Sequence, residues 1–80
     1  MKTAFVTGSS GYLGSHVCKQ LKKAGWKVFG YDYQQPKHEY LDMWENADIR
    51  DELSLYGALK RCKPNVVFHF AGRIEVGLSL

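Results

Sequence analysis

The stretch from Phe5 to Gly14 constrains the fold of this chain more than any other part of it. An apolar run, Ala4-Phe5-Val6, is followed by the glycine-rich sequence Thr7-Gly8-Ser9-Ser10-Gly11-Tyr12-Leu13-Gly14. Apolar residues then recur at helical spacing, at Leu13, Val17, Leu21 and Ala24. A strand, a glycine-rich turn and a helix in this order predict a phosphate-binding site at the start of the helix, where backbone N–H groups are free.

Each of the three glycines has a predicted role in such a site. Gly8 can adopt backbone angles that a β-carbon forbids. Gly11 has no side chain that would hold a pyrophosphate away from the backbone, and Gly14 lets the helix lie close to the strand. An ordinary β-to-α turn is the alternative interpretation. The flanking strand and helix, and an acid at the expected distance, argue against it.

The composition is that of a folded chain, with 45% hydrophobic and 24% charged residues in a length of 80 residues. The net charge is +3, and the two tight basic groups, Lys22-Lys23 and Lys60-Arg61-Cys62-Lys63, each lie where a helix is expected to end. Favourable interaction with the helix dipole explains these groups, so we expect no nucleic-acid partner.

Two cysteines, Cys18 and Cys62, have neither metal-ligand nor CxxC spacing. Reduced thiols of a cytoplasmic protein are the natural interpretation. The apolar runs are too short for a secretory signal or a membrane span, so we expect neither, and no membrane partner.

The remaining pattern alternates strands with helices. We expect strands at 2–7, 27–32, 43–47 and 65–72, helices at 12–24 and about 51–62, and a loop at 33–42. The second helix is expected to pack through Leu55, Tyr56, Leu59 and Cys62. The fold class is therefore α/β, a partial Rossmann fold with a parallel sheet of strand order 3-2-1-4 and helices on both faces.

Asp32 ends the second predicted strand, 18 residues after Gly14. An acid near this spacing accepts hydrogen bonds from the adenosine ribose hydroxyls of a dinucleotide. Because its charge repels a 2′-phosphate, it favours NAD over NADP. A solvated loop aspartate is the alternative. Tyr33, the next residue, joins the candidate site.

Four segments in order resemble a known family. They are Thr7 to His16, the terminal Asp32, the block Asp48-Ile49-Arg50-Asp51, and Val67-Phe68-His69-Phe70-Ala71-Gly72. Together they are similar to the extended short-chain dehydrogenases/reductases, the NAD-dependent epimerases and dehydratases, and most of all to those that epimerise UDP-glucose and UDP-galactose. The resemblance covers essentially the whole chain, and it implies that residues 1–80 form the N-terminal part of a dinucleotide-binding domain.

The resemblance implies a set of cofactor-binding residues. Tyr12 and Leu13 would offer N–H groups to the pyrophosphate, and Asp48 and Ile49 would hold the adenine edge. The path to the nicotinamide ribose would be lined by Phe70, Ala71 and Gly72. The family usually has a lysine where this chain has Ile74, and the neighbouring Arg73 is the candidate for the missing cation.

The catalytic parts of the family are not expected within this chain. Tyr33 and Lys37 have the Tyr-x-x-x-Lys spacing but straddle Pro36, while Tyr56 and Lys60 lie on a helix that covers the sheet. His69 lies within an apolar strand and is expected to be a buried, hydrogen-bonded neutral histidine. We therefore expect NAD binding without activity, the alternative being a non-catalytic dinucleotide-binding or self-assembling interaction module.

Self-association is expected from the edge of the fourth strand. Val66, Val67, Phe68 and Phe70 would form an apolar edge without a charged residue, and such edges recruit other strands. We expect that strand, or the segment 73–80, to be covered by a second copy in a two-fold dimer.

Overall fold

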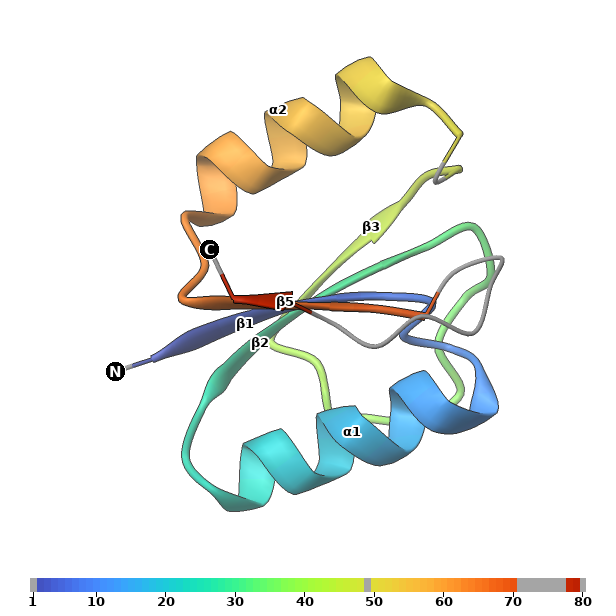
Figure 1. The fold of residues 1–80 in the computed structure, drawn as a ribbon. Helices are drawn as coiled ribbons and strands as arrows, with labels where there is room; N and C mark the ends of the chain where they lie inside the picture. The colour runs from blue at the N-terminus through green and yellow to red at the C-terminus, as the bar shows by residue number, and fades with distance from the viewer. Residues whose placement is uncertain (1, 49, 71–77, 80) are drawn as a thin grey trace.

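A computed structural model describes residues 2–48, 50–70 and 78–79 (Figure 1). Its elements in chain order are β1 (Thr3–Thr7), α1 (Tyr12–Lys23), β2 (Lys27–Asp32), β3 (Met43–Asn46), α2 (Glu52–Cys62), β4 (Val66–His69) and β5 (Leu78–Ser79). The first six lie within a few residues of the bounds expected from the sequence. Neither helix in the described ranges is long and apolar enough to cross a membrane.

The strands form one sheet of order β3-β2-β1-β4-β5, in which the first four strands are parallel. Figure 1 shows α1 on one face of the sheet and α2 on the other. The predicted fold class and the strand order 3-2-1-4 are confirmed. Parallel strands bring their carboxyl ends to one edge of the sheet, so the residues that follow β1, β2 and β4 lie near one another.

The short strand β5 was not expected. It pairs antiparallel with β4, so that Ser79 lies opposite Val66 and Leu78 opposite Val67. The expectation of an open apolar edge is therefore wrong along these two residues of β4, because a later segment of the same chain supplies the missing backbone partner.

Apolar side chains fill both faces of the sheet. The face under α1 buries Ala4, Val6, Cys18, Leu21 and Val28. The face under α2 buries Phe5, Phe29, Tyr31 and Ala58. Alternate residues of β1 and β2 thus point to opposite faces, and all of them after Thr3 and Lys27 are buried, as expected for central parallel strands. Burial raises the pKa of the Cys18 thiol to about 12, so this residue acts as a core side chain.

The α2 helix differs from its expected packing at one position. Leu55, Leu59 and Cys62 pack against the sheet as predicted. Tyr56 was expected beside them but is 68% exposed. It lies one residue from Leu55, which is 100° of rotation on a helix, and this rotation carries its ring away from the sheet.

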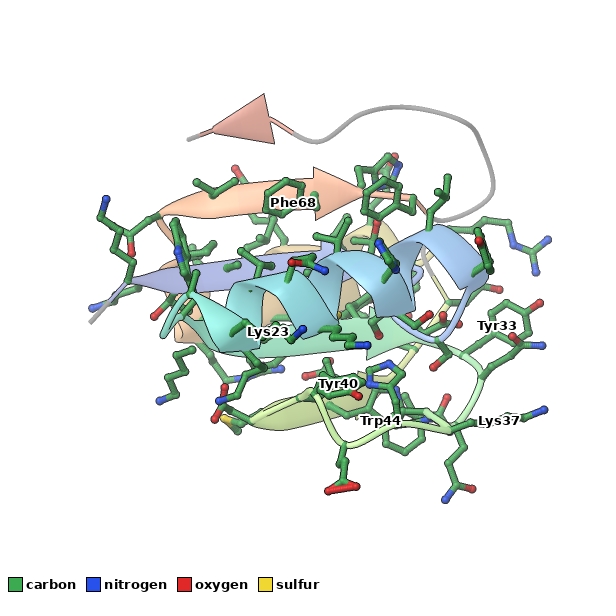
Figure 2. The ribbon with its side chains drawn as sticks, turned by 90° about the horizontal axis from the view of Figure 1, so that it is seen from below. Lys23, Tyr33, Lys37, Tyr40, Trp44 and Phe68 are labelled. Carbon is green, nitrogen blue, oxygen red and sulfur yellow. The ribbon has the colours of Figure 1, made fainter. Side chains whose placement is uncertain are left out.

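The connection from β2 to β3 is a loop, as predicted, and it covers part of the sheet face that carries α1. Figure 2 looks onto that face and labels Lys37 and Tyr40 of this connection. Leu41 packs into the core beneath α1. A β-carbon added to Gly30 would lie 2.6 Å from Leu41 Cδ1, so the loop lies directly on the backbone of β2.

Asp42 fastens the end of this loop. Its carboxylate accepts hydrogen bonds from the Val28 N–H at 2.7 Å and from Lys22 Nζ at 2.8 Å. The hydrogen bond from Lys22 is the main cause of the lowered pKa of Asp42. A single carboxylate therefore joins the loop to β2 and to the last turn of α1.

Lys63 provides a test of the end of α2. This C-cap residue has φ of 49°, in the left-handed region that favours glycine. We expect Lys63→Gly to raise the free energy of unfolding by about 0.5–1 kcal/mol, because glycine adopts this conformation without strain. Urea unfolding followed by circular dichroism measures the change.

The matched control is Lys60→Gly, in the last turn of the same helix. It removes the same side chain from a helical position and is expected to lower the free energy of unfolding by about 1 kcal/mol. Equal effects of the two substitutions would contradict the left-handed cap.

Candidate functional site at the carboxyl ends of the strands

The glycine turn begins where β1 ends. Gly8 has φ of 68°, so this position requires the left-handed conformation expected of it. The Gly8 N–H donates to the Tyr31 carbonyl at 2.9 Å, and the Gly11 N–H donates to the Gly8 carbonyl at 3.0 Å. The first bond joins the turn to β2, and the second closes the turn on itself.

Gly14 lets the first turn of α1 rest on the glycine turn. A β-carbon at this position would lie 2.0 Å from the Gly8 carbonyl oxygen and 2.8 Å from its carbon. No side chain fits against backbone atoms at those distances. The sequence predicted a close approach to the strand, and the structure places the contact on the turn that follows the strand. Gly11 is less constrained, since its added β-carbon would lie 3.3 Å from the same oxygen.

The start of α1 presents backbone donors. Gly11 is the N-cap and has no side chain that could cap the helix. The first helical hydrogen bond runs from the Ser15 N–H to the Gly11 carbonyl at 2.9 Å, so Tyr12, Leu13 and Gly14 precede it. Tyr12 is 88% exposed, so it does not pack into the core. N–H groups at the positive end of a helix dipole are suited to an anion such as a phosphate.

Asp32 lies against the glycine turn. It is 7% exposed, and its Oδ2 accepts the Ser10 N–H at 3.0 Å. Its Oδ1 accepts the Gln34 N–H at 3.0 Å. Each carboxylate oxygen has two lone pairs, so both retain capacity for a hydroxyl group. Tyr33 is exposed, and Figure 2 shows it at the end of the molecule where α1 begins.

Asp48 follows β3 and is oriented by Arg50. The Arg50 Nη2 atom lies 2.7 Å from Asp48 Oδ2, and the Arg50 N–H donates to Oδ1 at 2.9 Å. The hydrogen bond from the Arg50 side chain lowers the pKa of Asp48 to about 2, so this carboxyl group is ionised at neutral pH. The cap of α2 is Asp51, which accepts the Ser54 N–H at 3.1 Å. Ile49 lies outside the described residues.

The end of β4 lies beside the end of β1. The Phe70 N–H donates to the Thr7 carbonyl and to Thr7 Oγ1, at 3.1 Å in each case. His69 Nδ1 lies 2.8 Å from Thr7 Oγ1, which confirms the expected hydrogen bond, although His69 is half-buried and not enclosed. The other candidates from this segment, Ala71, Gly72 and Arg73, lie outside the described residues.

The structure thus brings the glycine turn, Asp32 and Phe70 to one edge of the sheet. It also adds a residue to which the sequence assigned no role. His38 Nε2 donates to the Ser9 carbonyl at 3.0 Å. The two residues are 29 positions apart, and no spacing or motif connects them. Sequence reasoning could place His38 in the loop at 33–42, but not against the glycine turn.

Comparison with known proteins shows which family this chain belongs to. The sequence model of the NAD dependent epimerase/dehydratase family matches residues 4–80. A UDP-glucose 4-epimerase of Rhizobium meliloti (strain 1021) is 44% identical over 78 residues, which cover 94% of this chain and 24% of that protein. A UDP-glucose 4-epimerase of Rhizobium leguminosarum bv. trifolii is 38% identical over 82 residues, 99% of this chain and 25% of that protein.

A solved structure shows the same fold. The UDP-glucose 4-epimerase of Brucella ovis in complex with NAD superposes with a TM-score of 0.81 and 28% identity, over 94% of this chain and 24% of that one. The chain therefore spans about a quarter of the length of the relatives it matches.

The contact at Gly14 can be tested by adding one methyl group. We expect Gly14→Ala to lower the free energy of unfolding by about 1–3 kcal/mol, because the methyl group must displace the Gly8 carbonyl. Thermal and urea unfolding of the ligand-free chain measure this loss.

Gly57→Ala is the matched control in α2. Its added β-carbon would meet Arg61 Nη1 at 3.4 Å, an ordinary contact. Alanine is the better helix former, so this substitution is expected to raise the free energy of unfolding by about 0.5–1 kcal/mol. If Gly14→Ala were equally stabilising, α1 would not rest on the glycine turn.

Proposed function

This chain belongs to the NAD dependent epimerase/dehydratase family, and on that premise we propose that it is the NAD-binding portion of a nucleotide-sugar epimerase or dehydratase. The observation that carries the proposal is the position of Asp32. Its carboxylate accepts the Ser10 N–H in the turn that leads into the uncapped start of α1. An acceptor for a ribose and donors for a diphosphate therefore lie next to each other, as an adenine dinucleotide requires.

We propose that the pyrophosphate lies over the start of α1. The N–H groups of Tyr12 and Leu13 would donate to its oxygens, and Gly11 and Gly14 would allow the close approach. Gly8 would hold the turn open in its left-handed conformation. Tyr12 and Leu13 are exposed, which supports a ligand on this surface of the molecule.

Asp32 and Tyr33 would contact the adenosine ribose, with the charge of Asp32 favouring NAD over NADP. Asp48 and Ile49 would hold the adenine edge. Arg50 supports this role of Asp48 because it keeps the carboxylate ionised and fixed in direction. Phe70, Ala71 and Gly72 would line the path to the nicotinamide ribose, with Arg73 as a nearby cation.

NAD supplies the hydride chemistry when it is bound, and residues 1–80 supply its adenosine and diphosphate contacts. We propose that the Tyr-x-x-x-Lys pair and the sugar-nucleotide site belong to protein outside these residues. The two pairs with this spacing support that division. Tyr33 and Lys37 lie in the loop between β2 and β3, and Tyr56 on α2 points away from the sheet. The substrate of the whole protein would be a nucleotide sugar such as UDP-glucose.

Self-association and location are further parts of the proposal. Phe68 and Phe70 stack at 6.4 Å and are half-buried on the face of β4 that is shared with α1, which supports a partner on that face. Light scattering over a concentration series tests the dimer. A cytoplasmic location is supported by the free thiols Cys18 and Cys62.

Cofactor selectivity tests the central proposal. We expect NAD to bind with a dissociation constant of roughly millimolar order, and more tightly than NADP. Asp32→Asn should weaken NAD binding by about tenfold to a hundredfold, since hydrogen bonds to a charged acceptor are lost, and should reduce the preference over NADP. Isothermal titration calorimetry with both cofactors measures the two constants.

Glu39→Gln is the control, because it removes one negative charge from an exposed position of the adjoining loop. It should leave the NAD preference unchanged. A wild-type chain that binds NADP more tightly than NAD would disprove the role of Asp32. A wild-type chain with no affinity for either cofactor would disprove the proposed function.

A further inference from the structure

We propose that His38 is a positioning residue that fixes the Ser9–Ser10 peptide of the glycine turn and thereby aligns the phosphate-binding N–H groups of α1. The proposal concerns His38 in the loop between β2 and β3, a residue that has no role in the site described so far. Its consequence for ligands rests on the proposed function, whereas its structural part does not.

The Ser9–Ser10 peptide is held from both sides. In a planar trans peptide the carbonyl and the following N–H point in opposite directions. The Ser9 carbonyl accepts from His38 Nε2 at 3.0 Å, and the Ser10 N–H donates to Asp32 Oδ2 at 3.0 Å. Rotation of this peptide would break both hydrogen bonds, so the pair specifies one orientation.

His38 is itself held in one orientation. A carbonyl can only accept, so Nε2 carries the proton and donates to Ser9. Nδ1 then accepts the Tyr40 N–H at 3.2 Å. A neutral imidazole has one donor and one acceptor, and both are used here. The Tyr40 ring also stacks on the imidazole, with centroids 5.4 Å apart and planes at 22°.

The loop that carries His38 is anchored independently of the glycine turn. Asp42 binds the Val28 N–H and Lys22, and Leu41 packs in the core. At its other end, Ser10 Oγ donates to the Gln34 carbonyl at 2.8 Å. The loop therefore contacts the glycine turn at two points, and its own attachment to the sheet holds these contacts in place.

We call the two hydrogen bonds that hold the Ser9–Ser10 peptide, from His38 and to Asp32, the clamp. The clamp lies close in sequence to the N–H groups proposed to bind the phosphate. Ser10 precedes Gly11, the N-cap of α1, and the N–H groups of Tyr12 and Leu13 follow directly. Gly11 is held by the bond from its N–H to the Gly8 carbonyl, so the Ser9–Ser10 peptide is the link between Gly8 and the N-cap. Its orientation sets the direction of the donors that come next.

Two variants of His38 distinguish its hydrogen bond to Ser9 in the glycine turn from its hydrogen bond with Tyr40 inside the loop. His38→Gln can carry an N–H donor to the position of Nε2 and so retain the bond to Ser9. His38→Asn ends near the position of Nδ1, where it can accept from Tyr40 but cannot reach Ser9. Circular dichroism and thermal unfolding of both variants show whether each is folded.

The first measurement needs no ligand. Amide hydrogen exchange followed by NMR reports the protection of the Ser10 and Gly11 N–H groups. We expect exchange about fivefold faster in His38→Asn, the change that corresponds to one net hydrogen bond, and recovery of most of the protection in His38→Gln. Equal exchange in wild type and His38→Asn would overturn the clamp.

The second measurement compares ADP with adenosine, which lacks the pyrophosphate. We expect His38→Asn to weaken ADP binding about fivefold more than adenosine binding, and His38→Gln to restore the difference. An equal loss for both ligands would overturn the link to the phosphate. If the wild-type chain bound neither ligand, the proposed function would fail, and the exchange rates alone would then support or overturn the clamp.

Discussion

The close contact between Gly14 and the Gly8 carbonyl is the constraint on which the candidate site depends. A β-carbon at Gly14 would lie 2.0 Å from that oxygen, so the first turn of α1 rests on the backbone of the glycine turn. The direction of α1 follows from this contact, and with it the direction of its first N–H groups. Leu21 and Cys18 then bury the rest of the helix against the sheet. The direction of the N–H groups at the start of α1 and the packing of this helix on the sheet thus both depend on the absence of a side chain at Gly14.

The second determinant of the site is the connection between β2 and β3. It contains no helix. Its side chains cover the sheet face in the way that a crossover helix usually does. Leu41 fills the core above Gly30, and Asp42 joins β2 to α1. The loop also reaches the glycine turn through His38 and Gln34. The same residues therefore cover the sheet and support the turn, which explains how so short a connection can be tolerated.

The chain belongs to the NAD dependent epimerase/dehydratase family, and its contacts can be compared with the length of its relatives. The chain corresponds to about a quarter of its relatives, and the part it matches contains the first βαβ unit. That unit brings the start of α1 and the carboxylate of Asp32 together at one edge of the sheet.

The sequence by itself determined the first six elements, the parallel order 3-2-1-4 and the position of Asp32 at the end of β2. These depend on local patterns: apolar runs, helical spacing, glycines at a turn, and the handedness of parallel crossovers. The tertiary structure decided what depends on distant partners. It paired Leu78 and Ser79 with β4, and it placed His38 on the Ser9 carbonyl. The physical reason is that a hydrogen bond between residues far apart in sequence leaves no periodic signal, because its geometry exists once the sheet has brought the two segments together.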